Sequence, residues 1–174
     1  MCSNLVCFLL LTMLAAGVNS FMRATRAAPL ARGLSRGLSM SAEGDLTELV
    51  SKYIAMGVGG KQPSQISDLF TDDALFIRPT GNPMSMGMYK EMLSNADVNI
   101  DSNELLSIDR MDISGDMAYV MFTAHGKFTF KGTPNDDVAV FTMIAKKFGD
   151  SWKFAGGQRS TGRGPEEPKP DFTV

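Results

Sequence analysis

Cysteine is almost missing from this chain of 174 residues. The two cysteines, Cys2 and Cys7, both lie in the first ten residues. If that segment is removed, the remaining protein has no cysteine, which excludes disulfides, thiolate nucleophiles and metal sites built on cysteine. The sequence therefore predicts no metal site and no bound cofactor.

Histidine is equally scarce, because His125 is the only one. A methionine cluster in the middle of the chain therefore has few partners with which it could bind a soft metal. We interpret the cluster as flexible packing of a core or cavity. It consists of Met84, Met86, Met88 and Met92.

Acidic residues are missing from residues 21–40, which contain four arginines. From residue 41 onward the chain carries thirteen of its seventeen Lys and Arg and all nineteen acids, a formal net charge of −6. Nucleic-acid binding needs a basic surface. An acidic domain of this kind is therefore not expected to have a nucleic-acid partner.

The chain also has no apolar run of the length that spans a bilayer. Residues 5–16 are apolar apart from one threonine, but a membrane helix needs about 20 such residues. The run is typical of a signal peptide, although no Lys or Arg precedes it. Val18 and Ser20 are small residues at the positions before a cleavage site, so residues 1–20 are predicted to be removed. We expect no membrane span in the mature protein.

Residues 21–42 have the composition of a transit peptide, rich in Arg, Ser, Ala and Leu and free of acids. A signal peptide followed by such a segment opening with Phe21 resembles the plastid-targeting leaders of algae with complex plastids, such as diatoms. The resemblance implies a plastid (chloroplast) protein whose mature chain begins between Met40 and Gly44. The alternative is a secreted protein with a basic linker.

Apolar residues at helical spacing predict three helices in the first half of the mature domain. Asp45, with Glu48 three residues later, would cap the first helix, and the glycines that follow residue 56 would end it. The predicted helices cover residues 45–58, 63–70 and 86–95.

Residues 69–81, LFTDDALFIRPTG, organise the domain. Thr71, Asp72 and Asp73 are turn formers. Residues 74–78 are β-prone and too few for a helix, so they predict a strand. The two acids could instead form an acid/base pair, but we interpret them as turn and capping residues. Pro79 and Gly81 end the strand.

The second half of the domain is predicted to be an antiparallel meander of four strands. The strand at 117–130 places Phe122 on one face and Tyr119 and Met121 on the other, with Phe141 or its neighbours beside them. A second apolar face indicates a partner, most simply a second copy of the chain. The predicted strands cover residues 104–113, 117–130, 138–148 and 152–160, with a loop at 131–137 and a disordered tail at 162–174.

Several of these features resemble the nuclear transport factor 2-like superfamily, which includes SnoaL-like polyketide cyclases and ketosteroid isomerases. They are Tyr53-Ile54-Ala55, the stretch 69–81, Gly87 before a helix and a closing strand with Trp152. The resemblance implies an α+β domain at residues 43–161. Three N-terminal helices would pack on a curved, mostly antiparallel sheet to form a cone with an apolar pocket inside.

The resemblance also allows a comparison with the isomerases. Tyr53 matches their oxyanion donor, but Arg78 stands in place of the general base, and residues 138–147 of the next-to-last predicted strand hold no acid. Guanidinium stays protonated and cannot abstract a proton. The chain is therefore not expected to be an isomerase.

Arg78 shares the parity of Phe76, on the face that lines the pocket in the family, so the pocket would hold a permanent cation suited to an anionic ligand. Alternatively Arg78 pairs with Asp109 or Asp112. Arg159 is a second cation or an exposed strand-end residue. The predicted ligand-binding residues are Tyr53, Phe76, Arg78, Met92, Phe122 and Arg159.

Two functions remain open, and we favour the first. One is a non-catalytic domain that binds a small apolar or anionic molecule or supports assembly. The other is a SnoaL-like cyclase, lyase or hydrolase, in which Tyr53, Arg78 and His125 would position an enolate or anion. His125 facing the pocket would favour the enzyme, whereas an outward His125, the usual place for a lone histidine on a strand, would favour binding. A third hypothesis is a pure interaction module of a larger plastid complex.

Overall fold

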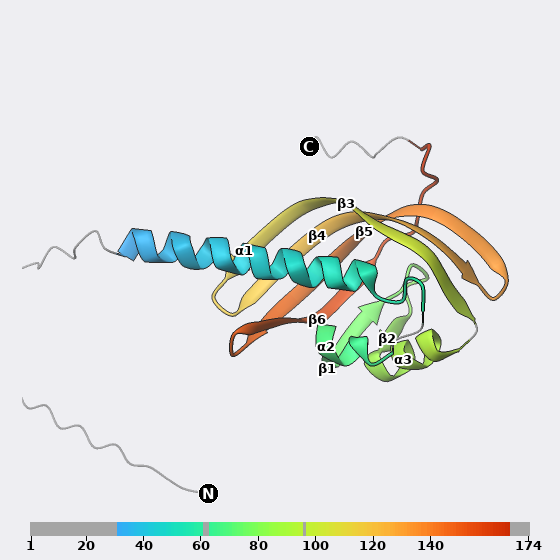
Figure 1. Cartoon of the computed structure of the whole chain (residues 1–174), viewed down its shortest axis with the longest axis horizontal. Coiled ribbons are helices and arrows are strands. Elements are labelled where there is room, and N and C mark those ends of the chain that lie inside the picture. Colours follow the sequence, from blue (N-terminus) through green and yellow to red (C-terminus); the bar gives the residue numbers. More distant parts are fainter. Residues whose placement is uncertain (1–30, 61–62, 96, 168–174) are drawn as a thin grey trace, which may run out of the picture.

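The structure is a computed structural model that describes residues 31–60, 63–95 and 97–167. The helices pack on one side of a strongly curved sheet, and α1 is the longest of them (Figure 1). In the described part of the chain, no helix is long and apolar enough to cross a membrane. The helices are α1 (Ala31–Ala55), α2 (Gln65–Leu69) and α3 (Met86–Ser94).

Six strands form one sheet in the order β2-β1-β6-β5-β4-β3. The four strands β3 to β6 form the predicted antiparallel meander, and β1 joins β6 in parallel. The predicted α+β class with helices on a curved, mostly antiparallel sheet is confirmed. The strands are β1 (Phe70–Ile77), β2 (Pro83–Ser85), β3 (Val98–Ser114), β4 (Met117–Phe130), β5 (Thr133–Phe148) and β6 (Ser151–Arg159).

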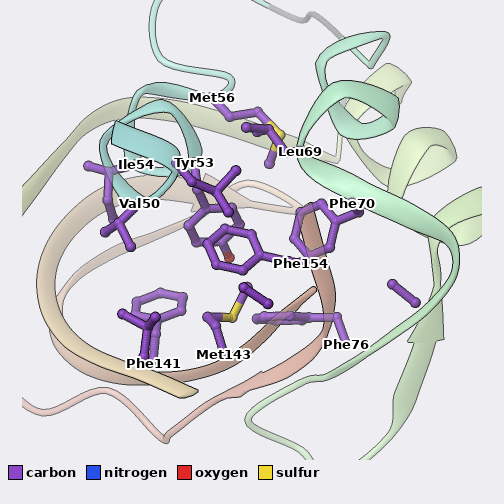
Figure 2. Close-up of a cluster of buried hydrophobic side chains, with 14 of the residues drawn as sticks. Val50, Tyr53, Ile54, Met56, Leu69, Phe70, Phe76, Phe141, Met143 and Phe154 are labelled. Carbon is purple, nitrogen blue, oxygen red and sulfur yellow. The ribbon is translucent and has the colours of Figure 1, made fainter. Parts of the chain in front are cut away.

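The core lies between α1 and the inner face of the sheet, and aromatic rings dominate it (Figure 2). Phe122 of β4 stacks on Phe141 of β5, with ring centroids 5.0 Å apart and planes 6° from parallel. Strand alternation directs both side chains to the inner face. The register places the two residues directly opposite each other, so their rings meet.

The prediction for the first helix was wrong at its start. α1 begins at Ala31, so Asp45 and Glu48 lie inside the helix, and Glu48 forms an ion pair with Lys52 at 2.7 Å. The Ala, Arg and Leu of residues 31–42 are good helix formers and offset the intervening glycines. The apolar residues at helical spacing begin only at Leu46. Hydrophobic periodicity therefore predicted only the second half of α1.

The predicted turn at Asp72 and Asp73 is part of strand β1. The register of β1 against β6 shifts between Phe70 and Leu75, and both acids are exposed in this irregular section. An irregular section of strand lets consecutive polar residues face solvent without ending the ladder. After the end of β1, the chain also forms a short strand, β2, that the sequence did not predict.

The predicted loop at 131–137 was wrong, because β5 begins at Thr133. The connection from β4 is a tight turn at Lys131 and Gly132, both with positive φ. The turn-forming residues after it stay extended because they pair with β4, as Asp137 does with Gly126. The strand β3 likewise begins at Val98, before the predicted 104.

The predicted disordered tail is in part ordered. Arg163 exchanges two backbone hydrogen bonds with Val138 of β5, at 2.8 and 2.9 Å. Gly162 lies against Asp137, where a Cβ atom would overlap the carboxylate. Residues 168–174 lie outside the described residues, as do residues 1–30 of the predicted leader.

Candidate functional site

Two buried tyrosines form a polar pair within the aromatic core. The hydroxyl oxygen of Tyr53, on α1, lies 3.5 Å from that of Tyr89, on α3. Five phenylalanine rings surround Tyr53 at centroid distances of 5.8 to 6.5 Å, and Figure 2 shows Tyr53 among several of them. We call this set the aromatic cage; its rings are Phe70, Phe76, Phe122, Phe141 and Phe154.

The electrostatics of the cage keep both phenols protonated. Burial raises the pKa of Tyr53 well above its ordinary value, and the neighbouring Tyr89 raises it further. Burial also raises the pKa of Tyr89, while the positive charge of Arg159 acts in the opposite direction on both groups. A protonated phenol can donate a hydrogen bond to a carbonyl or anionic oxygen.

Arg159 ends β6 and points inward at the edge of the cage. Its guanidinium donates to Asp137 at 2.5 Å, and only 16% and 21% of the two side chains are exposed. It also lies 5.8 Å from the ring centroids of Phe128 and Phe141, within the range of cation–π attraction. The alternative interpretation of Arg159 as an exposed strand-end residue is therefore wrong.

Arg78 and Arg159 each follow a residue of the last pair between β1 and β6. Ile77 pairs with Gln158 in parallel, so the next residue on each strand is an arginine. The Nε of Arg78 is buried, and none of the described residues accepts a hydrogen bond from it. Within the described part of the chain no ion pair joins Arg78 to Asp109 or Asp112, the alternative that the sequence left open.

The two carboxylates proposed as partners of Arg78 interact elsewhere. Asp109 accepts hydrogen bonds from Ser107 at 2.7 Å and from Thr123 at 2.6 Å. Asp112 pairs with Arg110 at 2.6 Å. Both carboxylates therefore belong to the outer side of the sheet.

His125 lies on the other face of β4 from Phe122 and Ala124. Its Nε2 is 2.6 Å from Asp136, and the ammonium of Lys127 is 3.3 Å from the same carboxylate. This hydrogen bond to His125 lowers the pKa of Asp136. His125 thus does not join Tyr53 and Arg78, the geometry that the enzyme hypothesis requires of it.

Comparison with known proteins places the chain in a family. A family model described as "Protein of unknown function (DUF3804)" matches residues 44–166. A crystal structure of an NTF2-like protein of unknown function from Prochlorococcus is 37% identical, with a TM-score of 0.60, and the match covers 67% of this chain and 92% of that one. This chain belongs to the NTF2-like family. The predicted resemblance is thereby confirmed.

More distant structures share the fold alone. An NTF2-like protein of unknown function in nutrient uptake from Rhodospirillum rubrum is 21% identical, with a TM-score of 0.60, covering 67% of this chain and 97% of that one. A putative Ca/calmodulin-dependent kinase II association domain from Exiguobacterium sibiricum is 16% identical, with a TM-score of 0.61, covering 80% and 99%. No curated protein matches the chain.

The sequence missed two residues of this NTF2-like site, Tyr89 and Asp137. Tyr89 lies three residues after Met86 and four before Leu93, and all three are buried, so helical spacing could have revealed it. Asp137 follows Pro134 and other turn formers, and no local signal indicates that it belongs to a strand. Only the pairing of β5 with β4 shows that Asp137 lies in a strand.

The remaining residues that the sequence predicted to bind a ligand lie in or against the hydrophobic core. Phe76 and Phe122 belong to the aromatic cage, while Met92 is half-buried against the core. Their role in binding a ligand stays a prediction. Among the described residues, no group of three or more His, Cys, Asp or Glu side chains could hold a metal ion.

The outer face of the sheet, opposite the helices, carries exposed apolar side chains. Phe141 was predicted on this face but lies in the core, because strand β5 alternates the other way. Ile144 and Thr142 instead face Tyr119 and Met121 across the strands. The outer apolar face comprises Leu75, Ile77, Met117, Tyr119, Met121, Val140, Ile144 and Phe148.

Proposed function

We propose that this NTF2-like chain is a non-catalytic domain that binds a small molecule with an apolar body and an anionic group. The observation that carries the proposal is that Arg78 and Arg159 each follow directly on the paired residues Ile77 and Gln158, and that Arg159 contacts the cage ring of Phe141. Arg78 has a buried Nε without an acceptor among the described residues, and a ligand carboxylate would supply one.

The chemistry of the side chains supports this ligand class. A guanidinium binds carboxylates in a planar, two-point geometry and keeps its charge at all physiological pH values. Within the core, the phenols of Tyr53 and Tyr89 offer further donors, and the rings of the cage suit an apolar body. The cage rings are closely packed, so the ligand must displace side chains such as Met143 or remain at the arginine end.

One observation favours the alternative, a SnoaL-like enzyme. Because β5 begins at Thr133, the next-to-last strand does contain acids, and Asp137 lies beside Arg159. Tyr53 and Arg78 could then position an enolate. However, a carboxylate engaged by a guanidinium is a poor general base because the pair favours the deprotonated, hydrogen-bonded form. Binding is therefore the function that we propose first.

Ligand binding can be measured by NMR with the purified protein and a series of monocarboxylic acids from acetate to phenylpropionate. We expect the acids to bind and the corresponding alcohols not to, with shifts in residues of the cage. Arg78→Met should abolish binding, whereas Arg110→Met should not, because Arg110 is exposed and pairs with Asp112. Equal binding of acids and alcohols, or by the Arg78→Met variant, would contradict the proposal.

We also propose that two copies associate through the outer apolar face. Five of its members are large apolar side chains that are 41% to 54% exposed. Large exposed apolar side chains gathered on one face of a sheet are typical of an interaction site. Such a pair could equally serve the assembly role or the interaction module that the sequence left open.

For location we propose the plastid, with secretion as the alternative. The support is the composition of residues 1–42, together with a family match that begins at residue 44. In the described part, Leu46 is the first fully buried side chain, so cleavage between Met40 and Gly44 would spare the core. The N-terminal sequence of the protein from its own cells tests this: a start at Phe21 would contradict the plastid leader.

A further inference from the structure

Ser67 lies where α2, α3 and β6 meet, and two lysines donate to it. The ammonium of Lys90, on α3, donates to the Ser67 hydroxyl oxygen at 2.6 Å. The ammonium of Lys153, on β6, donates to the Ser67 carbonyl oxygen at 2.8 Å. Both hydrogen bonds are partly buried, so two positive charges converge on one residue.

Among the described residues, neither ammonium forms an ion pair with a carboxylate, since the pairs within 4.0 Å involve other cations. Two like charges held close together repel each other, more strongly where water is partly excluded. A doubly charged anion at the Ser67 hydroxyl would remove this repulsion and accept hydrogen bonds from both lysines.

We propose that Ser67 is a phosphorylation site whose phosphate is held by Lys90 and Lys153. The phosphoryl donor would be a nucleoside triphosphate bound by a protein kinase. The Ser67 hydroxyl oxygen attacks the γ-phosphorus, the bond to the bridging oxygen breaks, the nucleoside diphosphate leaves, and the hydroxyl proton passes to the base of the kinase. The product carries about −1.5 to −2 charges and three acceptor oxygens.

The surroundings of Ser67 suit a kinase that prefers acidic substrates. Asp68 follows it directly, and Asp72 and Asp73 lie shortly after, all three exposed. α2 has only five residues, and its buried side chains are Ile66 and Leu69, so Ser67 itself lies on the less buried side of the helix. Ser67 is half-exposed between the buried residues Ile66 and Leu69, so the modified side chain would stay at the surface.

A phosphate at Ser67 would tie together three elements that support the aromatic cage. Lys90 is next to Tyr89 on α3, and Lys153 is next to Phe154 on β6. Phosphorylation would therefore fix the positions of Tyr89 and of the cage residue Phe154 without contacting a ligand. This inference does not depend on the proposed ligand, since its test requires none.

The test uses the full chain with phosphoserine introduced at position 67, and phosphorus NMR to measure the second pKa of the phosphate. The matched control carries phosphoserine at Ser51, an exposed residue of α1 whose hydroxyl donates to the Thr47 carbonyl. We expect the phosphate at Ser67 to titrate about one unit lower than that at Ser51, because two cations favour its dianion. Lys90→Met and Lys153→Met should each reverse part of this shift, and Lys90→Arg should keep it.

Equal titration of the two phosphates, or a shift that survives both methionine substitutions, would overturn the inference. Phosphopeptide mapping of the protein from its own cells should find the modification at Ser67. If mapping finds none, and the unmodified protein instead binds inorganic phosphate through the same two lysines, the site takes a free ion and covalent modification is refuted.

Discussion

At the scale of single residues, the cage depends on how closely β5 and β6 approach. Gly157 of β6 faces Met143 of β5, and a Cβ atom at position 157 would lie 2.8 Å from the Thr142 carbonyl oxygen and overlap the Met143 sulfur. Only glycine lets a core methionine occupy this place. The same strand then ends in Arg159, so its path decides where the guanidinium lies.

We therefore predict that Gly157→Ala destabilises the protein by about 1–3 kcal/mol, the usual cost of overpacking a core. Urea denaturation would measure the free energy of unfolding. Gly87→Ala is the matched control, because its Cβ atom would meet nothing closer than 3.8 Å. If both substitutions had the same small effect, the close approach of β5 and β6 would be in doubt.

The tyrosines predict a distinct pH dependence. Burial raises the pKa of Tyr53 and Tyr89 above about 10, the ordinary value for tyrosine. Because the folded pKa values are raised, this contribution to stability is complete below pH of about 10 and is lost as the pH rises further. Tyrosinate absorbance should thus show that two of the three tyrosines ionise only on unfolding. Ionisation of all three in the folded state would contradict the buried pair.

At the scale of elements, a glycine within α1 and a glycine just after it have opposite effects on stability. The helix contains Gly44, whose added Cβ atom would meet no atom within 4 Å. After the helix, Gly57 has a φ of +80°, and a Cβ atom added there would lie 3.0 Å from the side chain of Ile100. The first glycine is a cost to the helix, whereas the second is required by the turn.

Accordingly, Gly44→Ala should stabilise the protein by about 0.5–1 kcal/mol through helix propensity. Gly57→Ala should destabilise it, since a left-handed backbone disfavours a side chain. Thermal unfolding monitored by circular dichroism compares the two variants. A destabilised Gly44→Ala variant would mean that α1 makes contacts at this position that the structure does not show.

At the scale of the whole molecule, the curved sheet has two apolar faces, and the helices cover only the inner one. The outer apolar face holds Ile144, Leu75 and Phe148, which are about half-exposed. The same side of the sheet also carries polar groups, among them the hydrogen-bonded set of Ser107, Asp109 and Thr123. Protein interfaces usually combine apolar and polar groups.

Ile144→Glu is predicted to convert the proposed dimer into a monomer, because a buried unpaired carboxylate opposes association. Sedimentation velocity would measure the change. Met88→Glu on α3 places the same charge at another exposed apolar residue and should leave the dimer intact. A wild-type monomer at all concentrations would contradict the proposed use of this face.

Much of the fold could be predicted from local pattern, and the errors share a cause. Along residues 117–130 the sequence predicts side chains that point alternately to the two faces of a strand, and β4 has those bounds. Asp72, Asp73 and residues 133–137 are turn formers by composition, yet they lie in β1 and β5 because neighbouring strands satisfy their backbone groups. Local propensity is thus overridden where a sheet supplies partners.

Spacing and residue chemistry were enough to predict the three helices, the four-strand meander and the inward parity of Tyr53, Phe76 and Phe122, although they missed the short strand β2. That Arg78 stands where the isomerases carry a general base follows from the resemblance to that family. Only the tertiary structure decided the pairing of Tyr53 with Tyr89, 36 residues apart, and of Arg159 with Asp137, 22 residues apart. The physical reason is that these contacts depend on the curvature and register of the sheet. Those properties result from all six strands together and leave no trace in any one segment.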